Sequence, residues 1–135
     1  MKVHIIKPII LGKLPKVISN HYNLNCDSNN VMVFPGAIKH IEKRHPQDLE
    51  KYFNKIEEII SNPDYVGQKP KEPKSVELIK EFEDDVLVAI KLDPSGYIYL
   101  STMYSLQNAK FKIKTRLKSG RLISYTDLLA NLKKK

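Results

Sequence analysis

The sequence predicts an α+β protein in which helices come first and antiparallel strands follow. Three observations support this fold class. Apolar residues recur at helical spacing over residues 36–61. Residues 75–104 instead alternate with a period of two, in three short runs separated by turn signals. Finally, 135 residues of which 41% are hydrophobic can bury one compact core, so we expect a single domain over residues 1–135.

Composition indicates the cellular compartment of this domain and argues against a disulfide, a zinc site and a membrane span. The single cysteine, Cys26, excludes an intramolecular disulfide, and no Cys/His cluster has zinc spacing. Lys7 and Pro8 interrupt the first apolar run, and no small-residue cleavage site follows it. No run approaches the roughly 18 uninterrupted apolar residues of a membrane span. We therefore expect a soluble, cytoplasmic protein with no metal, no other cofactor and no membrane partner.

The first thirty-odd residues carry few helical signals. Residues 2–18 contain short apolar runs broken by Pro and Gly, which indicate one or two edge strands. Residues 20–30 read as an Asn-rich loop, and residues 31–34 as a short strand or extended lead-in.

Two helices are predicted next. Pro35 and Gly36 open the first, on which Ile38, Ile41 and His45 share one stripe. Pro46 suits the first turn of the second helix, which is expected to continue without a break until Asn62–Pro63 stops it. Its apolar face comprises Leu49, Phe53, Ile56 and Ile60. Residues 63–74 are then expected to form a loop, with Asp64 as an anchor.

Three strands, at residues 75–82, 85–92 and 96–104, are predicted to form an antiparallel meander. In the middle strand one face carries Val86, Val88, Ile90 and Leu92, and is expected to pack against the helices. Lys91 lies on the opposite face with Leu87 and Ala89. Strict alternation in the third strand would place Tyr97, Tyr99, Ser101 and Met103 on one face and Ile98, Leu100, Thr102 and Tyr104 on the other.

The net charge of +8 is concentrated at the C-terminal end. Residues 107–135 hold nine Lys/Arg against Asp127 alone, whereas residues 1–106 hold 14 of each sign. Alternation in "AKFKIKTRLK" is compatible with a strand, but Ser105 is a plausible N-cap and Gly120 a plausible residue after the last helical turn. We therefore predict a basic amphipathic helix, followed by a short helix over about residues 126–132.

A one-sided basic segment attracts polyphosphate, because each neutralised phosphate releases condensed counterions. The residues predicted to contact nucleic acid are Lys110, Lys112, Lys114, Arg116, Lys118 and Arg121. For Lys133–Lys135 the simpler interpretation is a solubilising tail.

His40 and His45 are the candidate proton-transfer groups, because histidine titrates closest to neutrality. Five residues of straight helix place them about 140° apart, so both face one ligand only if the helix frays before Pro46. The alternative is a buried capping role for His45 and a solvated surface position for His40. A spacing of five residues is poor for two histidines that bind one metal ion. His4 and His21 are expected to be structural.

Lys91, Thr102 and Tyr104 supply a cation and hydroxyls of the kind that would bind a phosphate. Each also has an ordinary interpretation: a solvated strand lysine, and two good strand formers. RNA carries its own nucleophile, the 2′-hydroxyl. A metal-independent ribonuclease therefore needs only a base, an acid, and groups that hold the charge of the phosphorane-like transition state.

The succession "PGAIKHIEKRHP", "IEEIISNPDYVG", "VELIKEF", "VLVAIKLD", "YIYLSTMY" and "KSGRLI" resembles the phage and mobile-element branch of the Barnase–EndoU–colicin–RelE superfamily. The likeness covers a core of about residues 31–123 and overlaps the basic C-terminal segment, residues 107–135. It implies a barnase-like fold, with N-terminal helices packed on a curved antiparallel β-sheet.

The same resemblance implies metal-independent RNA cleavage, often by a toxin or effector of a phage or mobile element. The implied site comprises His40, His45, Lys91, Thr102, Tyr104 and Arg121. We expect an endoribonuclease that acts by transesterification, with His45 as acid or base, His40 or Tyr104 as its partner, and Arg44, Lys91 and Arg121 on the phosphate. Its partners would be RNA and an antitoxin or immunity protein.

Two other function classes fit the same residues. One is a non-catalytic nucleic-acid-binding module that uses the basic segment and stacks bases on Tyr97 and Tyr99. The other is a protein-interaction module that docks to an antitoxin or immunity partner. Cleavage of RNA in the presence of EDTA separates the enzyme from both.

Overall fold

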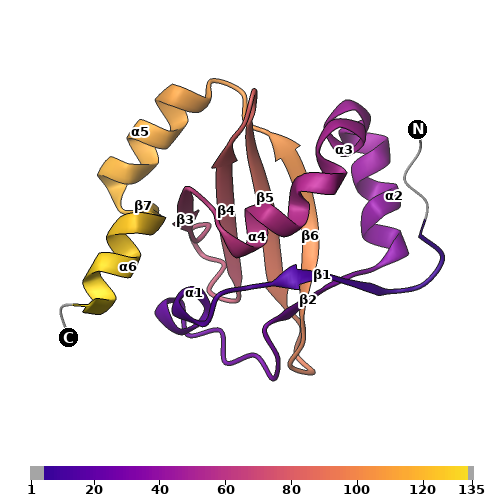
Figure 1. The fold of residues 1–135 in the computed structure, drawn as a ribbon, viewed down its shortest axis with the longest axis horizontal. Coiled ribbons are helices and arrows are strands. Elements are labelled where there is room, and N and C mark those ends of the chain that lie inside the picture. The colour runs from indigo at the N-terminus through magenta and orange to yellow at the C-terminus, as the bar shows by residue number, and fades with distance from the viewer. Residues whose placement is uncertain (1–4, 134–135) are drawn as a thin grey trace.

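A seven-stranded sheet organises the computed structural model, which describes residues 5–133 (Figure 1). The strand order is β1-β2-β6-β5-β4-β3-β7. The strands are β1 (Ile9–Lys13), β2 (Asn30–Val33), β3 (Tyr65–Gly67), β4 (Ser75–Glu81), β5 (Asp85–Leu92), β6 (Ile98–Ser105) and β7 (Leu122–Ser124). The helices are α1 (Lys16–His21), α2 (Pro35–Arg44), α3 (Pro46–Tyr52), α4 (Ile56–Ser61), α5 (Ala109–Ser119) and α6 (Tyr125–Lys133).

The predicted α+β class and the β4–β5–β6 meander are both confirmed. Every neighbouring pair in the sheet is antiparallel except β2 and β6, which run parallel with Val31 opposite Ile98. The parallel pair arises because α2, α3, α4 and the strands β3 to β5 separate β2 from β6 along the chain, so the connection is a crossover and not a hairpin.

Three elements differ from the sequence-based expectation at the ends of the sheet. Residues 65–67 form strand β3 and not a loop, because Val66 is completely buried between β4 and β7. Strand β7 was not predicted, since three residues are too few to show a period. Lys16–His21 is helical, and only Ile9–Lys13 forms the expected edge strand. The predictions for His4, as a structural residue, and for Lys134 and Lys135, as part of a solubilising tail, lie outside the described residues.

Helices α2 to α4 cover one face of the sheet and close the main core (Figure 1). The expected continuous helix from Pro46 is broken into α3, a 3₁₀ turn (Phe53–Lys55) and α4. Tyr52 leaves helical geometry at this break, with φ −118° and ψ 3°. Its ring stays buried at 4% exposure while Ile56, Ile59 and Ile60 of α4 are fully buried. Positions 52, 56, 59 and 60 have the spacing of one helix face, so periodicity in the sequence does not reveal the break.

Tyr52 also joins α3 to the turn between β4 and β5. Its hydroxyl donates to Asp84 Oδ2 at 2.7 Å and accepts the Asp84 backbone N–H at 3.0 Å. Lys51 Nζ reaches the same carboxylate at 3.3 Å. The hydrogen bond from Tyr52, followed by that from Lys51, lowers the pKa of Asp84.

Substitution Tyr52→Phe is therefore expected to lower the melting temperature by about 4 °C, the usual effect of losing one net hydrogen bond in a chain of this size. Because the pKa of Asp84 is lower in the folded state, its contribution is complete above the carboxyl's ordinary pKa and is lost as the pH falls through the folded-state value. The difference between the two proteins should thus shrink in acid. Thermal unfolding at neutral and acidic pH measures it, and an equal difference at both would contradict this account.

A β-bulge in β6 reverses the predicted facing of its residues. Ala89 lies opposite Thr102 but Ile90 lies opposite Leu100, so Ser101 is an extra residue in β6. Ile98, Leu100 and Met103 are consequently all buried in the main core. The expected pairing of Met103 with Tyr99 on one face was wrong.

Helix α5 is helical as predicted and packs on the other face of the sheet. It begins after Asn108 (φ 52°), not at Ser105, which belongs to β6; Gly120 (φ 85°) ends it, as the sequence indicated. A second apolar cluster forms beneath α5, comprising Ile79, Leu87, Leu106, Ile113 and Leu122. This helix covers only part of the face, and the remainder is open.

Candidate active site

A cavity of about 170 Å³ lies on the open part of this second face, across β4, β5 and β6. Glu77, Ala89 and Thr102 are cross-strand neighbours in its floor. The residues that line it are Lys69, Glu72, Ser75, Val76, Glu77, Leu87, Ala89, Lys91, Ser101, Thr102 and Tyr104. Three predicted site residues, Lys91, Thr102 and Tyr104, therefore share one cavity, because the bulge turns Thr102 and Tyr104 to the side of Lys91.

An ion pair between Glu77 and Arg121 stands at the centre of this face. Arg121 follows α5, and its Nε and Nη2 donate to Glu77 Oε1 at 3.0 and 2.9 Å, while Nη2 also reaches Oε2 at 3.1 Å. The Glu77 residue is 5% exposed. A carboxylate so far from water needs a charged partner, so Arg121 is held in one orientation.

Arg116 on α5 adds a second guanidinium. Its Nη1 is buried and has no hydrogen-bond partner within the described part of the chain. Such a buried nitrogen without a partner is uncommon in a folded protein. Arg116 lies close enough to Tyr104 for its charge to act on the phenol.

The hydroxyl of Tyr104 stays protonated at neutral pH. Burial raises the pKa of Tyr104, and the negative charge of Glu77 raises it further, while Arg116 and Arg121 act in the opposite direction. These four side chains thus form one electrostatic unit in which Tyr104 keeps its proton and is able to donate it to an acceptor.

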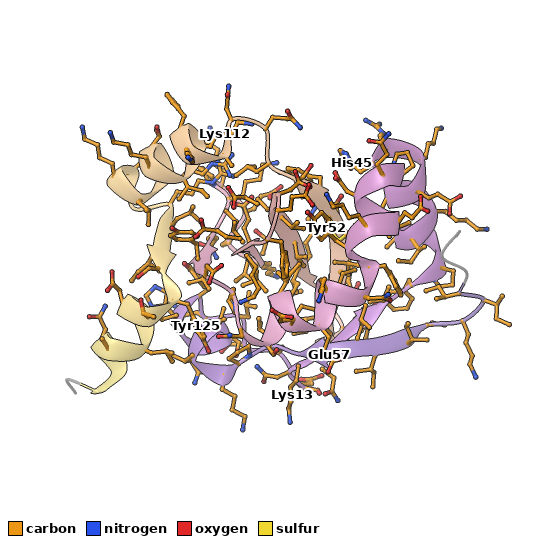
Figure 2. The ribbon with its side chains drawn as sticks, turned by 45° about the horizontal axis from the view of Figure 1, so that its top comes forward. Lys13, His45, Tyr52, Glu57, Lys112 and Tyr125 are labelled. Atoms are coloured by element: carbon orange, nitrogen blue, oxygen red, sulfur yellow. The ribbon has the colours of Figure 1, made fainter. Side chains whose placement is uncertain are left out.

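His45 lies at the junction of α2 and α3 (Figure 2), and its ring contacts Tyr104 of this unit. It leaves helical geometry at φ −140° and ψ 58°, as the sequence suggested for a residue before proline. Its half-buried ring meets the ring of Tyr104, with centroids 5.3 Å apart and planes 30° apart. The junction is fastened to β6 by Asp48, whose Oδ2 accepts the Ser105 N–H at 2.9 Å.

His40 and Arg44 are not brought to the cavity in the same way. Both are exposed on α2, and neither is among the residues that line the cavity. Within residues 5–133 the histidine in ring contact with the cavity wall is His45, so the two predicted histidines do not form a pair around one ligand.

Lys91 of β5 is partly exposed and lines the cavity. Among the described residues it has no ion-pair partner. Its ammonium group is therefore free to bind an anion.

The cations of α5 fall on two sides of the helix. Lys112 and Arg116 are partly buried and lie one helical turn apart, and the charge of Arg116 acts on Tyr104. Figure 2 labels Lys112 on α5 and His45 beside α3, both along the upper edge of that view. Lys110 and Lys114 line a separate groove with Glu81, Asp85 and Tyr65. Lys118 is exposed. None of the six predicted nucleic-acid contacts is among the residues that line the cavity, but Arg121 pairs with Glu77 and the charge of Arg116 acts on Tyr104, both of which do line it.

Glu77 and Ser101 were missed by sequence reasoning. Glu77 is the one charged residue among residues 75–79, on the strand face opposite Val76 and Leu78, and this was a usable signal. Nothing local reveals that its partner lies 44 residues later. Ser101 enters the cavity only because of the bulge.

Neither a metal-ligand cluster nor a membrane-spanning helix is found in the described part of the chain. Residues 5–133 contain no group of three or more His, Cys, Asp or Glu side chains placed to hold a metal ion. Across the same residues, no helix has both the length and the apolar character needed to cross a membrane.

Comparison with known proteins adds one finding. The family model described as phage-Barnase-EndoU-ColicinE5/D-RelE like nuclease3 matches residues 9–112, most of the chain, including β1 to β6, α2 to α4 and all the strand residues of the cavity. No curated protein and no solved structure matches significantly. The match confirms the resemblance seen in the motifs. The chain belongs to the phage Barnase-EndoU-ColicinE5/D-RelE-like nuclease 3 family.

Proposed function

We propose that this nuclease-family protein is a metal-independent endoribonuclease that cleaves RNA by transesterification. The observation that carries the proposal is the cavity on β4–β6, which Lys91, Thr102 and Tyr104 line together; His45 contacts Tyr104, and the charge of Arg116 acts on it. These groups match the needs of a phosphodiester whose own 2′-hydroxyl is the nucleophile.

In the proposed reaction a base removes the proton of the 2′-hydroxyl, and the 2′-oxygen attacks the adjacent phosphorus. The bond from phosphorus to the 5′-oxygen breaks, and an acid protonates that oxygen. The products are a 2′,3′-cyclic phosphate and a 5′-hydroxyl, so no co-reactant is needed.

His45 is assigned to proton transfer because it is the histidine that contacts the cavity wall. Tyr104 is a better partner for it than His40, since Tyr104 touches the His45 ring and lines the cavity. Arg116 and Lys91 would stabilise the charge that develops on the non-bridging oxygens. Arg121 would orient Glu77, whose carboxylate is a second candidate for the base.

Cleavage of end-labelled single-stranded RNA in EDTA tests the proposal. We expect a product that ends in a 2′,3′-cyclic phosphate. The matched control is the same oligonucleotide with one 2′-deoxy residue at the cleaved position, which should resist cutting there. Cleavage that requires added Mg²⁺ would refute metal independence, and cleavage at the 2′-deoxy position would refute transesterification. Salt-sensitive binding without cleavage would select the nucleic-acid-binding module instead.

The proposal also covers where the enzyme acts and what restrains it. We infer that the enzyme acts in the cytoplasm as a toxin or effector of a phage or mobile element, and that an antitoxin or immunity protein restrains it. Support comes from the family and from the open cavity, which a protein partner could cover. This role is tested by measuring cell growth while the protein is expressed alone or together with neighbouring genes of the element. Expression alone should inhibit growth, and the gene of the restraining protein should restore it.

The two sides of α5 predict different effects on RNA binding. Lys112→Gln should reduce the slope of log affinity against log salt concentration by roughly 0.7, because one phosphate of the single strand is no longer neutralised. Lys110→Gln removes the same charge from the same helix, but this lysine faces Asp85 and Glu81. The slope of log affinity against log salt concentration should therefore change less for Lys110→Gln than for Lys112→Gln. Anisotropy titrations over a range of salt concentrations measure both, and equal effects would contradict the assignment of sides.

A further inference from the structure

Three aromatic rings gather on the sheet beyond Lys91. Phe34 and Tyr97 have ring centroids 5.6 Å apart, Phe34 and Tyr99 6.5 Å, and Tyr97 and Tyr99 6.0 Å. Tyr97 remains 37% exposed, and the other two are partly exposed. We call these three residues the aromatic cluster.

The aromatic cluster lies on the same face of the sheet as the candidate active site. Tyr99 is the direct cross-strand neighbour of Lys91, which lines the cavity. Ile98 and Leu100, on either side of Tyr99, point into the main core and are fully buried. Alternation along β6 therefore turns Tyr97 and Tyr99 away from that core and toward the cavity side.

Lys91, the cation beside the cluster, is placed to hold a phosphate in the cavity. Lys91 has no ion-pair partner among the described residues and stands between the cluster and Thr102. Burial, and after it the negative charge of Asp93, raises the pKa of Tyr97, so the hydroxyl edge of this ring lies beside a carboxylate. The faces of the rings can pack against an apolar, planar ligand.

A nucleotide base joined to a bound phosphate is such a ligand. Stacking on aromatic rings is open to every base, because each base has a π-face. Bases in a duplex are already stacked on one another, so the cluster suits an unpaired nucleotide.

We propose that the aromatic cluster is a base-stacking subsite, which holds an unpaired nucleotide of single-stranded RNA next to the scissile phosphate. The inference rests on the proposed function for the nature of the substrate. It adds a preference for single strands and a second anchoring point about one strand's width from Lys91.

The test uses a short 2′-O-methyl oligoadenylate, which cannot be cleaved because its nucleophile is blocked, and an abasic oligonucleotide of the same length and charge. Fluorescence anisotropy should show tighter binding of the oligoadenylate to the wild-type protein. The double variant Tyr97→Leu/Tyr99→Leu should lose about 5-fold or more in affinity for each base no longer stacked. Its affinity for the abasic probe should stay the same.

Two variants serve as controls. Tyr97→Phe/Tyr99→Phe keeps both rings and should retain the preference for bases. Phe111→Leu removes an aromatic ring that is 64% exposed on α5, away from the cluster, and should change nothing. Circular dichroism confirms that each variant is folded.

The outcomes separate this inference from the proposed function. If the wild type prefers bases through the cluster but does not cleave RNA in EDTA, the subsite stands and the ribonuclease proposal falls. If the wild type cleaves RNA while the leucine variant keeps its full preference for bases, the subsite is overturned. Unchanged RNA binding by that variant would assign the cluster to a protein partner instead.

Discussion

His45→Ala is expected to slow RNA cleavage by about 100-fold or more, the usual scale for loss of a general acid or base. The melting temperature and the affinity for uncleavable RNA should stay close to wild type, because the His45 ring is half-exposed and packs on one face of Tyr104. Single-turnover cleavage, measured beside thermal unfolding, distinguishes chemistry from folding. A structural histidine would instead lower activity only in step with the folded fraction.

His40→Ala is the matched control, since it removes the same type of side chain from an exposed position on α2, the helix that ends just before His45. Its cleavage rate should remain close to wild type, and the double variant should match His45→Ala alone. If the two histidines act as one unit, either single substitution should cost as much as both. Small, additive effects from both substitutions would mean that His45 is not the proton-transfer group. The site would then be rebuilt around Glu77, Lys91, Tyr104 and Arg121.

Arg121→Ala is expected to destabilise the fold by about 3 kcal/mol, because it leaves the Glu77 carboxylate buried without a partner. Glu77 is 5% exposed, and three donor–acceptor contacts to Arg121 satisfy it. Denaturant unfolding measures the loss. A change below about 1 kcal/mol would show that water or a neighbouring cation replaces the arginine.

The double variant Glu77→Gln/Arg121→Met separates stability from function. It buries no charge, so it should regain most of the stability lost by Arg121→Ala. RNA cleavage should stay impaired, since both members of the electrostatic unit around Tyr104 are gone. A double variant with wild-type cleavage would make the ion pair purely structural.

Elements with strong local signals could be predicted from the sequence. Pro35 and Pro46 mark the starts of α2 and α3, and a period of two marks β4 to β6. Helix was chosen over strand for α5 from two expected caps: Gly120 does end α5 in the left-handed conformation that glycine adopts readily, whereas Ser105 lies in β6. Elements of three residues, such as β3 and β7, carry no period and exist because neighbouring strands pair with them.

The candidate site could be predicted only in part. Lys91, Thr102 and Tyr104 were chosen by residue type, and His45 by its position before Pro46, where a helix frays. The roles of all of them remain predictions. Glu77 was overlooked because a single acidic residue in a strand is normally solvated, and its burial depends on an arginine that arrives from the far end of α5.

By itself, the sequence determined the fold class, the basic C-terminal segment and the family motifs, because periodicity, caps and charge are local properties of the chain. Only the tertiary structure decided which side chains share the cavity. The bulge at Ser101 turned Thr102 and Tyr104 to the face of Lys91, and sheet register placed Glu77 beside them. Register and long-range ion pairs depend on contacts between distant segments, which no local pattern specifies.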